Sequence, residues 1–326
     1  MFLSTPVCYP PDKQQSEQSK ILDKSRANTS TTQYLEKILQ HSNLVKEVEL
    51  IDIHKHCLVL SSDQYHLLVY NETKFMLFNN DLQQLKECHW NKVKIGVDIE
   101  DIQWSISGLE LLILTGESLF KFNPLTFELN QIELNHSSGK HRFDSHFCYM
   151  TIDSDDNVLL NRDYGDSFEK YLLKTGQLIE QWTKSDIYGD HSKVFINQIY
   201  LNIQNNLLSM NVDVCGQGVI DLVDAKTMKL RKRMDLSDIH LAFLSNVGHY
   251  LFVASGLNWS RNIKIANYYL LSTSRGEMKK LKRDILNNRF ICDLSLMNSN
   301  SCIILIENHV KKHQQLQLYK NTTKLS

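Results

Sequence analysis

An eight-residue motif recurs six times along the chain, and its spacing constrains the fold more than any other feature of the sequence. The copy YLLKTGQL, from Tyr171 to Leu178, contains an apolar strand end, a turn at Lys174-Thr175-Gly176 and the start of another strand. The copies start at Phe78, Phe122, Tyr171, Val223, Leu271 and Tyr319. Successive starting numbers differ by 44, 49, 52, 48 and 48, so one repeated unit organises most of the chain.

A second unit precedes each copy and consists of two apolar runs separated by residues that favour turns. Examples are CYMTIDSDDNVLLN at 148–161 and QIYLNIQNNLLSMN at 198–211, and such a pattern predicts a β-hairpin. A hairpin plus the motif makes four strands, a to d, with the motif forming the c–d turn. Such sheets bury both faces by packing around an axis. We therefore predict an all-β, six-bladed β-propeller.

The two ends of the repeated region indicate how the ring is closed. The sixth copy reaches Ser326, so the sixth unit lacks its outermost strand. The segment LVKEVELI at 44–51 alternates, with Val45, Val48 and Leu50 apolar between charged residues, as a half-exposed strand does. We expect it to supply the missing strand, so that the propeller spans 44–326.

The residues before the propeller have a different composition. Residues 1–30 are polar and lack bulky apolar periodicity, which predicts a disordered tail. Residues 31–43 are expected to form a short helix, because Ser30 and Gln33 match a capping box.

The stretch VIDLVDAKTMKL resembles the WD-repeat and related quinoprotein-like propellers, whose blades run through Trp-Asp into a TG-containing turn. Here the matching dipeptide in this copy is Val223-Asp224, and the first position is apolar in all six copies although Trp-Asp and the usual Gly-His are absent. The resemblance implies a propeller over residues 44–326. It also makes seven blades the alternative, since WD-repeat rings commonly have seven.

Charge and cysteine content exclude several classes of protein. The 36 basic and 37 acidic residues nearly cancel, so no overall field selects nucleic acid or an anionic membrane. The seven cysteines are scattered without a CxxC pair, and neither a secretory signal nor an apolar run of about 20 residues is present. We expect a cytoplasmic protein, with the nucleus as an alternative, and no membrane span.

Candidate chemical sites are weak. His54 and His56 share a strand face, and a loop carries three histidines, but neither set completes a metal site. The loop RDYGDSFEK at 162–170 offers Asp163, Asp166 and Glu169, which a solvated b–c turn explains equally well. We predict no catalytic residue, metal or cofactor. A lactonase-like hydrolase using the central channel remains the enzymatic alternative.

Two predicted d strands in neighbouring blades are basic. Charged outer strands discourage edge pairing, and they could also dock an acidic protein, RNA or anionic lipid, although sequence-specific RNA reading is disfavoured. This predicted basic rim comprises Lys229, Arg231, Lys232, Arg233, Lys279, Lys280, Lys282 and Arg283.

The b–c and d–a connections of a propeller emerge on the same face of the ring. The longest b–c connection, at 254–267, contains Trp259 and Arg261, which would share that face with Tyr164, His141 and Arg142. Trp, Tyr and Arg often dominate binding energy at protein interfaces. The sequence therefore predicts a non-catalytic scaffold that binds protein partners of unknown identity through this loop face.

Overall fold

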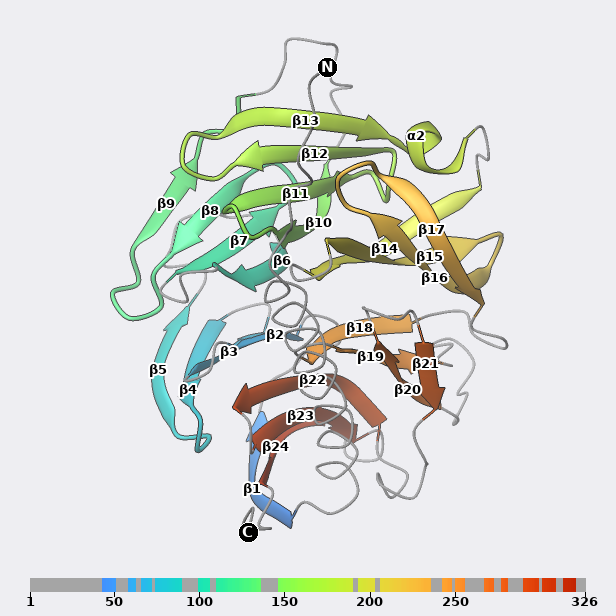
Figure 1. Ribbon diagram of the computed structural model, residues 1–326. Helices are drawn as coiled ribbons and strands as arrows, with labels where there is room; N and C mark the ends of the chain where they lie inside the picture. Colours follow the sequence, from blue (N-terminus) through green and yellow to red (C-terminus); the bar gives the residue numbers. More distant parts are fainter. Residues whose placement is uncertain are drawn as a thin grey trace, which may run out of the picture.

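The described residues of the computed structural model form six four-stranded antiparallel sheets (Figure 1). It describes residues 43–50, 58–62, 66–71, 74–89, 99–105, 110–135, 146–189, 193–202, 206–235, 242–247, 250–255, 267–272, 277–280, 290–298, 301–308 and 313–320. The predicted tail at 1–30 and the predicted helix at 31–43 lie outside these residues, apart from the last residue of the helix range.

Five sheets follow the chain order. Sheet 1 contains β2 (Leu58–Ser62), β3 (His66–Asn71), β4 (Lys74–Asn79) and β5 (Gln84–His89). Sheet 2 contains β6 (Ile99–Trp104), β7 (Leu111–Thr115), β8 (Leu119–Phe122) and β9 (Leu129–Ile132). Sheet 3 contains β10 (Phe147–Ile152), β11 (Asn157–Arg162), β12 (Ser167–Leu172) and β13 (Gln177–Thr183). Sheet 4 contains β14 (Val194–Asn202), β15 (Leu207–Val214), β16 (Gln217–Asp224) and β17 (Lys229–Asp235). Sheet 5 contains β18 (Ala242–Val247), β19 (Tyr250–Ser255), β20 (Asn267–Ser272) and β21 (Glu277–Lys280).

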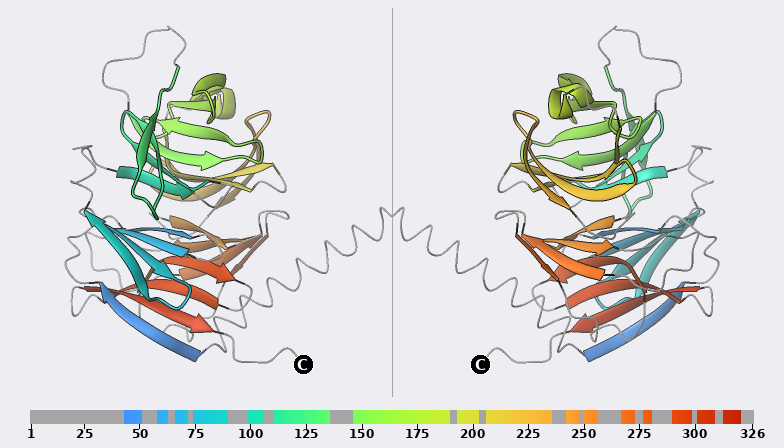
Figure 2. Two further views of the ribbon diagram at one scale, coloured as in Figure 1. Left: turned by 90° about the vertical axis from the view of Figure 1, so that its left-hand side faces the viewer. Right: turned by 90° about the vertical axis from the view of Figure 1, so that its right-hand side faces the viewer.

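The sixth sheet combines both ends of the described chain. It contains β22 (Phe290–Asn298), β23 (Ser301–Asn308), β24 (His313–Lys320) and, at its edge, β1 (Asn43–Leu50). β1 runs antiparallel to β24, with Glu47 opposite Gln317, and the two strands lie side by side in both views of Figure 2. The predicted pairing of the N-terminal strand with the last motif is confirmed.

The recurring motif forms the turn between the last two strands of a sheet. An Asn or Asp ends or directly follows the third strand in several copies, and its side-chain oxygen accepts backbone N–H groups of the turn, as Asn123 does from Leu125 and Asp224 from Lys226. The sixth residue then adopts a positive φ at Phe127, Gly176 and Met228. The N–H of this sixth residue donates a hydrogen bond to the carbonyl oxygen of the residue four positions earlier, with an N···O distance of 2.8 Å in all three copies. One backbone conformation thus recurs with different side chains, although glycine adopts it at the lowest cost.

Four of the outer strands share a β-bulge near one end: β5, β13 and β17 have it just after the motif turn, and β1 has it opposite Tyr319 and Leu318 of β24. The register shifts leave Val45, Leu85, Ile179 and Arg231 without a direct partner on the neighbouring strand. A bulge twists and disrupts an edge strand, which discourages pairing with another chain. The alternation grouped Val45 with Val48 and Leu50, but the bulge interrupts the alternation at Val45, whose side chain is 52% exposed.

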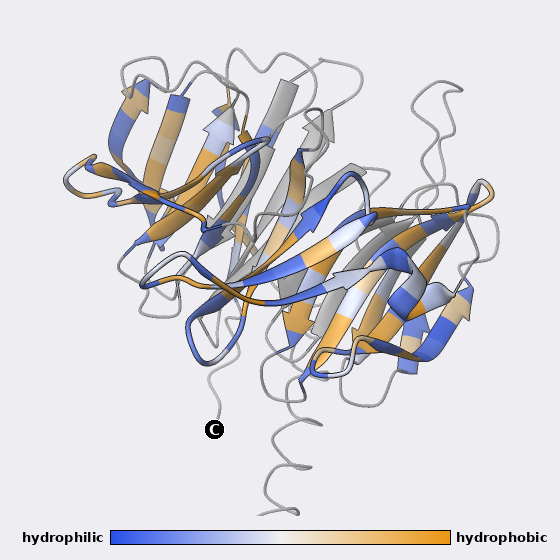
Figure 3. Cartoon of the chain, turned by 90° about the horizontal axis from the view of Figure 1, so that it is seen from above, coloured by the Kyte–Doolittle hydropathy of each residue, from blue (hydrophilic) through white to orange (hydrophobic). Residues whose placement is uncertain are grey.

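Apolar clusters fill the spaces between neighbouring sheets. Leu50 of β1 packs with Leu318 of β24 and with Leu67 and Phe78 of sheet 1, so the N-terminal strand β1 belongs to the core between sheets 6 and 1. Further clusters join sheets 1 and 2, 2 and 3, 3 and 4, and 4 and 5. The strands accordingly carry hydrophobic stretches between hydrophilic ends (Figure 3). Each fully buried aliphatic or aromatic side chain contributes about 1.5–3 kcal/mol.

Polar contacts also join neighbouring sheets near the centre. Asp101 of β6 accepts the N–H of Met150 in β10 at 3.0 Å, and Gln103 donates to the Met150 carbonyl at 2.6 Å. In the next pair of sheets, Thr151 accepts the N–H of Leu201 at 2.9 Å. The innermost strands are thus held by side chains that bind the neighbouring backbone.

A second series of contacts joins the sheets at the periphery. Lys46 of β1 donates to the carbonyl of Leu82 at 3.0 Å, and Lys86 of β5 donates to the carbonyl of Leu125. After β9, Asn135 donates its N–H to the carbonyl of Gly176 at 2.8 Å. In each case an outer strand, or the segment that follows it, contacts the motif turn of the next sheet.

Candidate interaction surface

The turn between β11 and β12 presents Tyr164 to solvent in a fixed backbone conformation. Asp163 and Tyr164 both have positive φ, at 48° and 55°, and Tyr164 is 45% exposed. The carbonyl of Tyr164 accepts the N–H of Ile196 at 2.7 Å, which ties this turn of sheet 3 to β14 of sheet 4. At Gly165 an added Cβ would lie 2.7 Å from the Ile196 side chain. Glycine is therefore required for the close approach of the two sheets.

His146, immediately before β10, supports the same turn. Its N–H donates to Asp163 Oδ1 at 3.0 Å, and its carbonyl accepts the Asp163 N–H at 3.0 Å. Its ring meets the Tyr164 ring edge-on, with centroids 5.8 Å apart. The backbone on the other side is held by Cys148, whose Sγ accepts the Tyr164 N–H at 3.4 Å. Tyr164 is therefore displayed on a rigid turn.

Phe195, the second residue of β14, lies next to this turn and is 56% exposed, the largest value among the exposed large hydrophobic residues described. Lys184 approaches its ring, with Nζ 5.8 Å from the ring centroid. The same ammonium group pairs with Asp166 of the β11–β12 turn at 2.8 Å. We use the name aromatic face for the surface made by His146, Asp163, Tyr164, Asp166, Lys184 and Phe195.

A short helix places Lys184 on the aromatic face. Helix α2 (Lys184–Tyr188) follows β13, and Thr183 caps it: Asp186 accepts the Thr183 N–H at 2.6 Å in a capping box. Tyr188 at its other end is buried, and Arg233 of β17 lies over its ring at 5.8 Å. The helix is thus fixed between sheets 3 and 4 at both ends.

Burial and nearby carboxylates raise two pKa values at the Tyr164 turn. Burial raises the pKa of the Tyr164 hydroxyl, and Cys148 and the carboxylate of Glu100 raise it further. Burial likewise raises the pKa of the Cys148 thiol to about 11, with Glu100 and Asp163 adding to the shift. Cys148 is therefore a neutral thiol at physiological pH, and it supports the turn rather than acting as a nucleophile.

Glu169 does not belong to the solvated turn that the sequence predicted. It lies in β12, is 1% exposed, and pairs with Arg162 at 3.0 Å while accepting the Tyr171 hydroxyl at 2.5 Å. Arg162 itself covers the Phe147 ring at 3.6 Å. The prediction was wrong because strand β12 begins at Ser167, so Glu169 faces the core together with Tyr171. A buried ion pair removes it from any pair of catalytic carboxylates with Asp163 and Asp166.

The cations of the predicted basic rim on β17 are all exposed, namely Lys229, Arg231, Lys232 and Arg233. Of these, Arg233 donates two hydrogen bonds to the fully buried Asp221, at 2.8 and 2.7 Å, and Arg231 pairs with Asp224. The first pair raises the pKa of Arg233 and makes it a structural cation.

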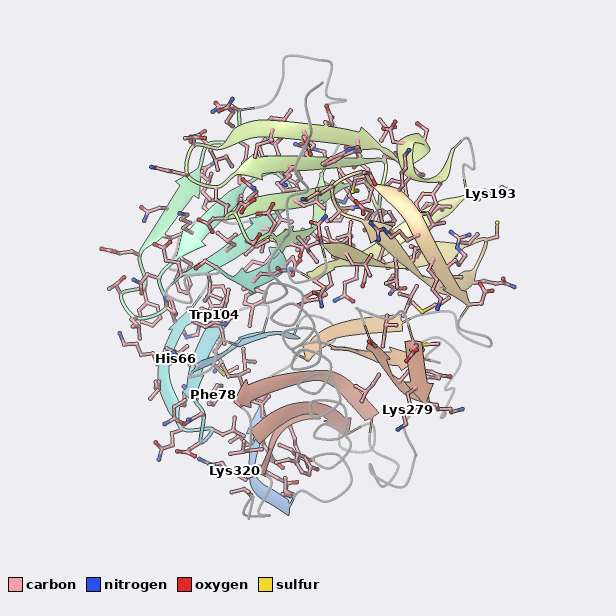
Figure 4. All side chains as sticks on the ribbon, viewed as in Figure 1. His66, Phe78, Trp104, Lys193, Lys279 and Lys320 are labelled. Atoms are coloured by element: carbon pink, nitrogen blue, oxygen red, sulfur yellow. The ribbon has the colours of Figure 1, made fainter. Side chains whose placement is uncertain are left out.

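On β21, Lys279 and Lys280 are exposed, and Lys280 lies 5.9 Å from the centre of the Tyr269 ring. Figure 4 shows Lys279 at the periphery of the molecule. The remaining two members of the predicted rim, Lys282 and Arg283, lie outside the described residues.

Four of the five predicted partner-binding residues lie outside the described residues. These are His141, Arg142, Trp259 and Arg261; the histidines His54, His56 and His136 lie outside them too. Within the described residues, no group of three or more His, Cys, Asp or Glu side chains could hold a metal ion. The described part of the chain also contains no helix long and apolar enough to cross a membrane.

Sequence reasoning indicated Tyr164 as a loop residue, which the structure shows exposed in the β11–β12 turn, and it did not indicate Phe195 or Lys184. Phe195 lies in the apolar run Val194-Phe195-Ile196, just before the predicted hairpin at 198–211, and nothing in the local pattern distinguishes it from an inward apolar residue. The signal for Lys184 was present: Thr183 and Asp186 have the spacing of a capping box.

Comparisons with known proteins identify the fold. No protein-family model matches the chain, and no curated protein matches its sequence significantly. Among solved structures, the WD40 domain of Neurospora crassa Pan2 matches with a TM-score of 0.54 and 8% identity over 87% of this chain and 97% of that domain. The β-propeller domain of Cps50 (Swd1) from Myceliophteria thermophila gives 0.53 and 10% identity over 86% and 100%. A chain of the mitotic checkpoint complex gives 0.53 and 12% over 86% and 93%.

This chain has a WD-repeat-like β-propeller fold. The resemblance that the motif turns suggested is therefore confirmed at the level of architecture. At 8–12% identity these structures establish the fold alone.

Proposed function

We propose that this chain is a non-catalytic scaffold whose six sheets form a closed propeller, and that it binds a partner protein through the aromatic face. Three observations support the closed ring. β1 completes the last sheet, its Leu50 packs against sheet 1, and Lys320 of β24 pairs with Asp81 of sheet 1 at 2.6 Å. A closed ring has no exposed sheet faces at its ends and can hold its loops rigidly.

The observation that carries the binding function is that Tyr164 and Phe195 are both exposed and lie on neighbouring, hydrogen-bonded segments of the backbone. Ile196, the residue after Phe195, donates its N–H to the Tyr164 carbonyl, and Tyr164 and Phe195 are each about half exposed. Exposed aromatic rings that need little ordering on binding are frequent contributors to interface affinity. Chains similar in fold include one found in the mitotic checkpoint complex, which is itself a protein assembly.

Proximity labelling combined with affinity capture tests the proposal. The test protein carries Tyr164→Asn and Phe195→Thr, since Asn tolerates the left-handed backbone at position 164 and Thr suits a strand. The matched control is Ile179→Thr, which removes a side chain of similar exposure, 47%, from the outer edge of sheet 3. Equal melting temperatures of all three proteins establish that the fold is retained.

We expect partners captured by the wild type to be lost from the double variant and kept by the Ile179→Thr control. An identical partner set for wild type and double variant contradicts binding through this face. Trp259 and Arg261 remain predicted contacts of the same loop face, and a separate Trp259→Ala, Arg261→Ala variant tests them.

The two alternative functions have less support. No observation within the described residues favours a hydrolase, because Glu169, one of the candidate carboxylates, is buried in an ion pair. Docking on the basic rim has fewer available cations than the sequence suggested, since Arg231 and Arg233 pair with acidic side chains of their own sheet.

A further inference from the structure

The outer edges of sheets 6, 1 and 2 carry exposed apolar side chains that the proposed function does not use. They belong to Leu44 and Val45 of β1, Leu85 of β5 and Leu125 of the motif turn before β9, and their exposed fractions lie between 42% and 52%. We use the name apolar strip for these four residues. They make up half of the eight exposed large hydrophobic residues described, and β1, β5 and β9 edge three neighbouring sheets (Figure 1). Such a concentration indicates a contact surface.

Two lysine contacts connect the apolar strip across the junctions between sheets. Lys46, the residue after Val45, donates to the carbonyl of Leu82 in the motif turn before β5. In the same way, Lys86 of β5 donates to the carbonyl of Leu125. Each outer strand is thus held against the motif turn of the next sheet, so the apolar strip is one connected surface rather than separate residues on three sheets.

The bulges restrict the kind of segment that can cover the apolar strip. Val45 and Leu85 are bulge residues without a direct partner on the neighbouring strand. A bulge disrupts the strand edge to which another strand would add. A covering segment therefore has to contact the side chains, as the apolar side of an amphipathic helix does.

A segment that could supply such a side immediately precedes β1. The sequence predicts a helix at 31–42, outside the described residues, and its apolar side would consist of Tyr34, Leu35, Ile38 and Leu39. Five residue steps separate Leu39 from Leu44, so their Cα atoms are at most about 18 Å apart. A segment tethered this closely has a high effective concentration at the apolar strip, which favours it over a separate molecule.

We propose that residues 31–42 fold back as a helix whose apolar side covers the apolar strip. A helix of this length extends about 18 Å and is marginal in water on its own, so packing against the strip supplies the stability that its length does not. The contact shields Val45 and Leu85 from solvent. It also covers the outer side of the junction where β1 completes the last sheet and packs against sheet 1.

Photocrosslinking on the full chain tests this contact directly. The photoreactive residue p-benzoylphenylalanine replaces Tyr34 in one protein and Gln33 in the matched control, and mass spectrometry identifies the crosslinked peptides. Successive residues of a helix differ by about 100° around its axis, which places Gln33 opposite the middle of the apolar side. We expect position 34 to crosslink within its own chain to peptides that contain 44–46 or 82–86, and position 33 to crosslink to them much less.

Hydrogen exchange of the amides at 34–39 measures how firmly the segment is held. The strip variant carries Val45→Thr and Leu85→Thr, since Thr suits a strand. The control is Ile179→Thr, which removes a bulge residue of 47% exposure from sheet 3. We expect exchange to be roughly three- to ten-fold faster in the strip variant than in the wild type, and to change less than about two-fold in the control. Equal melting temperatures establish that the fold is retained.

Equal crosslinking from positions 33 and 34 would overturn the inference, as would equal exchange rates in the wild type and the strip variant. Crosslinks only between two chains would show that a second copy covers the apolar strip, and they would overturn it as well. Protection that appears only after addition of a cell extract would assign the strip to another protein, with the same consequence. None of these outcomes affects the proposed function, because the aromatic face lies on sheets 3 and 4.

Discussion

Replacing Gly176 by alanine should destabilise the protein far more than the same change at Gly216. Both glycines have positive φ, 67° and 85°, so both substitutions place a Cβ in the left-handed region at a cost of about 1–2 kcal/mol. They differ in their surroundings. A Cβ at Gly176 would lie 1.8 Å from the Glu133 carbonyl oxygen, whereas nothing lies within 4 Å of a Cβ at Gly216.

The close contact at Gly176 lies at the junction of sheets 2 and 3. The Glu133 oxygen is backbone, so the segment after β9 must move away, and two hydrogen bonds from Asn135 to Gly176 and Thr175 are then lost. At about 1 kcal/mol each, they bring the expected loss for Gly176→Ala to about 3–4 kcal/mol, against about 1–2 for Gly216→Ala.

Urea unfolding followed by circular dichroism measures this difference. The Gly216→Ala variant is the matched control, since it carries the same conformational cost without the contact. Equal free energies of unfolding for the two variants would refute the reasoning, because they would show that the outer contact between sheets 2 and 3 adds nothing to stability.

Three further predictions concern buried polar and apolar groups. Burial raises the pKa of Asp101 to about 7 from an ordinary value of 3.8, and its hydrogen bonds to Met150 and Ile102 oppose the shift. The folded state therefore binds the proton more tightly than the unfolded state, so the free energy of unfolding falls as pH rises from about 4 to 7. Asp101→Asn should remove that slope, worth at most roughly 4 kcal/mol, and an unchanged pH profile in thermal denaturation would contradict the assignment. Glu169→Ala removes the carboxylate that pairs with the buried Arg162 and should lower the free energy of unfolding in urea by about 3–5 kcal/mol. Neutralising the exposed Asp81–Lys320 pair is the control and should lower it by less than about 1 kcal/mol. Similar decreases in the two variants would show that burial does not determine the contribution of an ion pair. Leu50→Ala should cost about 2–5 kcal/mol and increase proteolysis of the β1 segment, while Val45→Ala, at the exposed bulge, should do neither.

The fold could be predicted from the sequence because its signals are local and repeated. The motif turns within the described residues use an Asn, Asp or Gly at a position where the turn conformation favours it, as at Asn123 and Gly176, and the hairpin before it alternates or is fully apolar. Six repetitions of such a pattern outweigh the ambiguity of any single strand. The pairing of β1 with β24 followed from counting strands, together with the alternation of residues 44–51.

The candidate site was predictable only in part, since it depends on contacts between sheets. The sequence indicated Tyr164 because it lies in a turn. Phe195 lies next to that turn because the N–H of Ile196 in sheet 4 donates a hydrogen bond to the Tyr164 carbonyl in sheet 3. Glu169 was misassigned because its partner Arg162 faces it across a strand pair, a relation that depends on where β12 begins. The bulges that turn Val45 and Ile179 outward shift the alternation by one residue, and alternation alone does not reveal such a shift.

Strand β1 is synthesised long before β24, the strand with which it pairs. Glu47 and its opposite residue Gln317 are 270 positions apart, so at about 5–20 residues per second the ribosome needs roughly 13–54 seconds to supply the second after the first. During that interval the segment from Asn43 to Leu50 has been made and its partner strand has not. A nascent chain in this state exposes Val48 and Leu50, which makes this segment the expected client site for a chaperone that acts during translation.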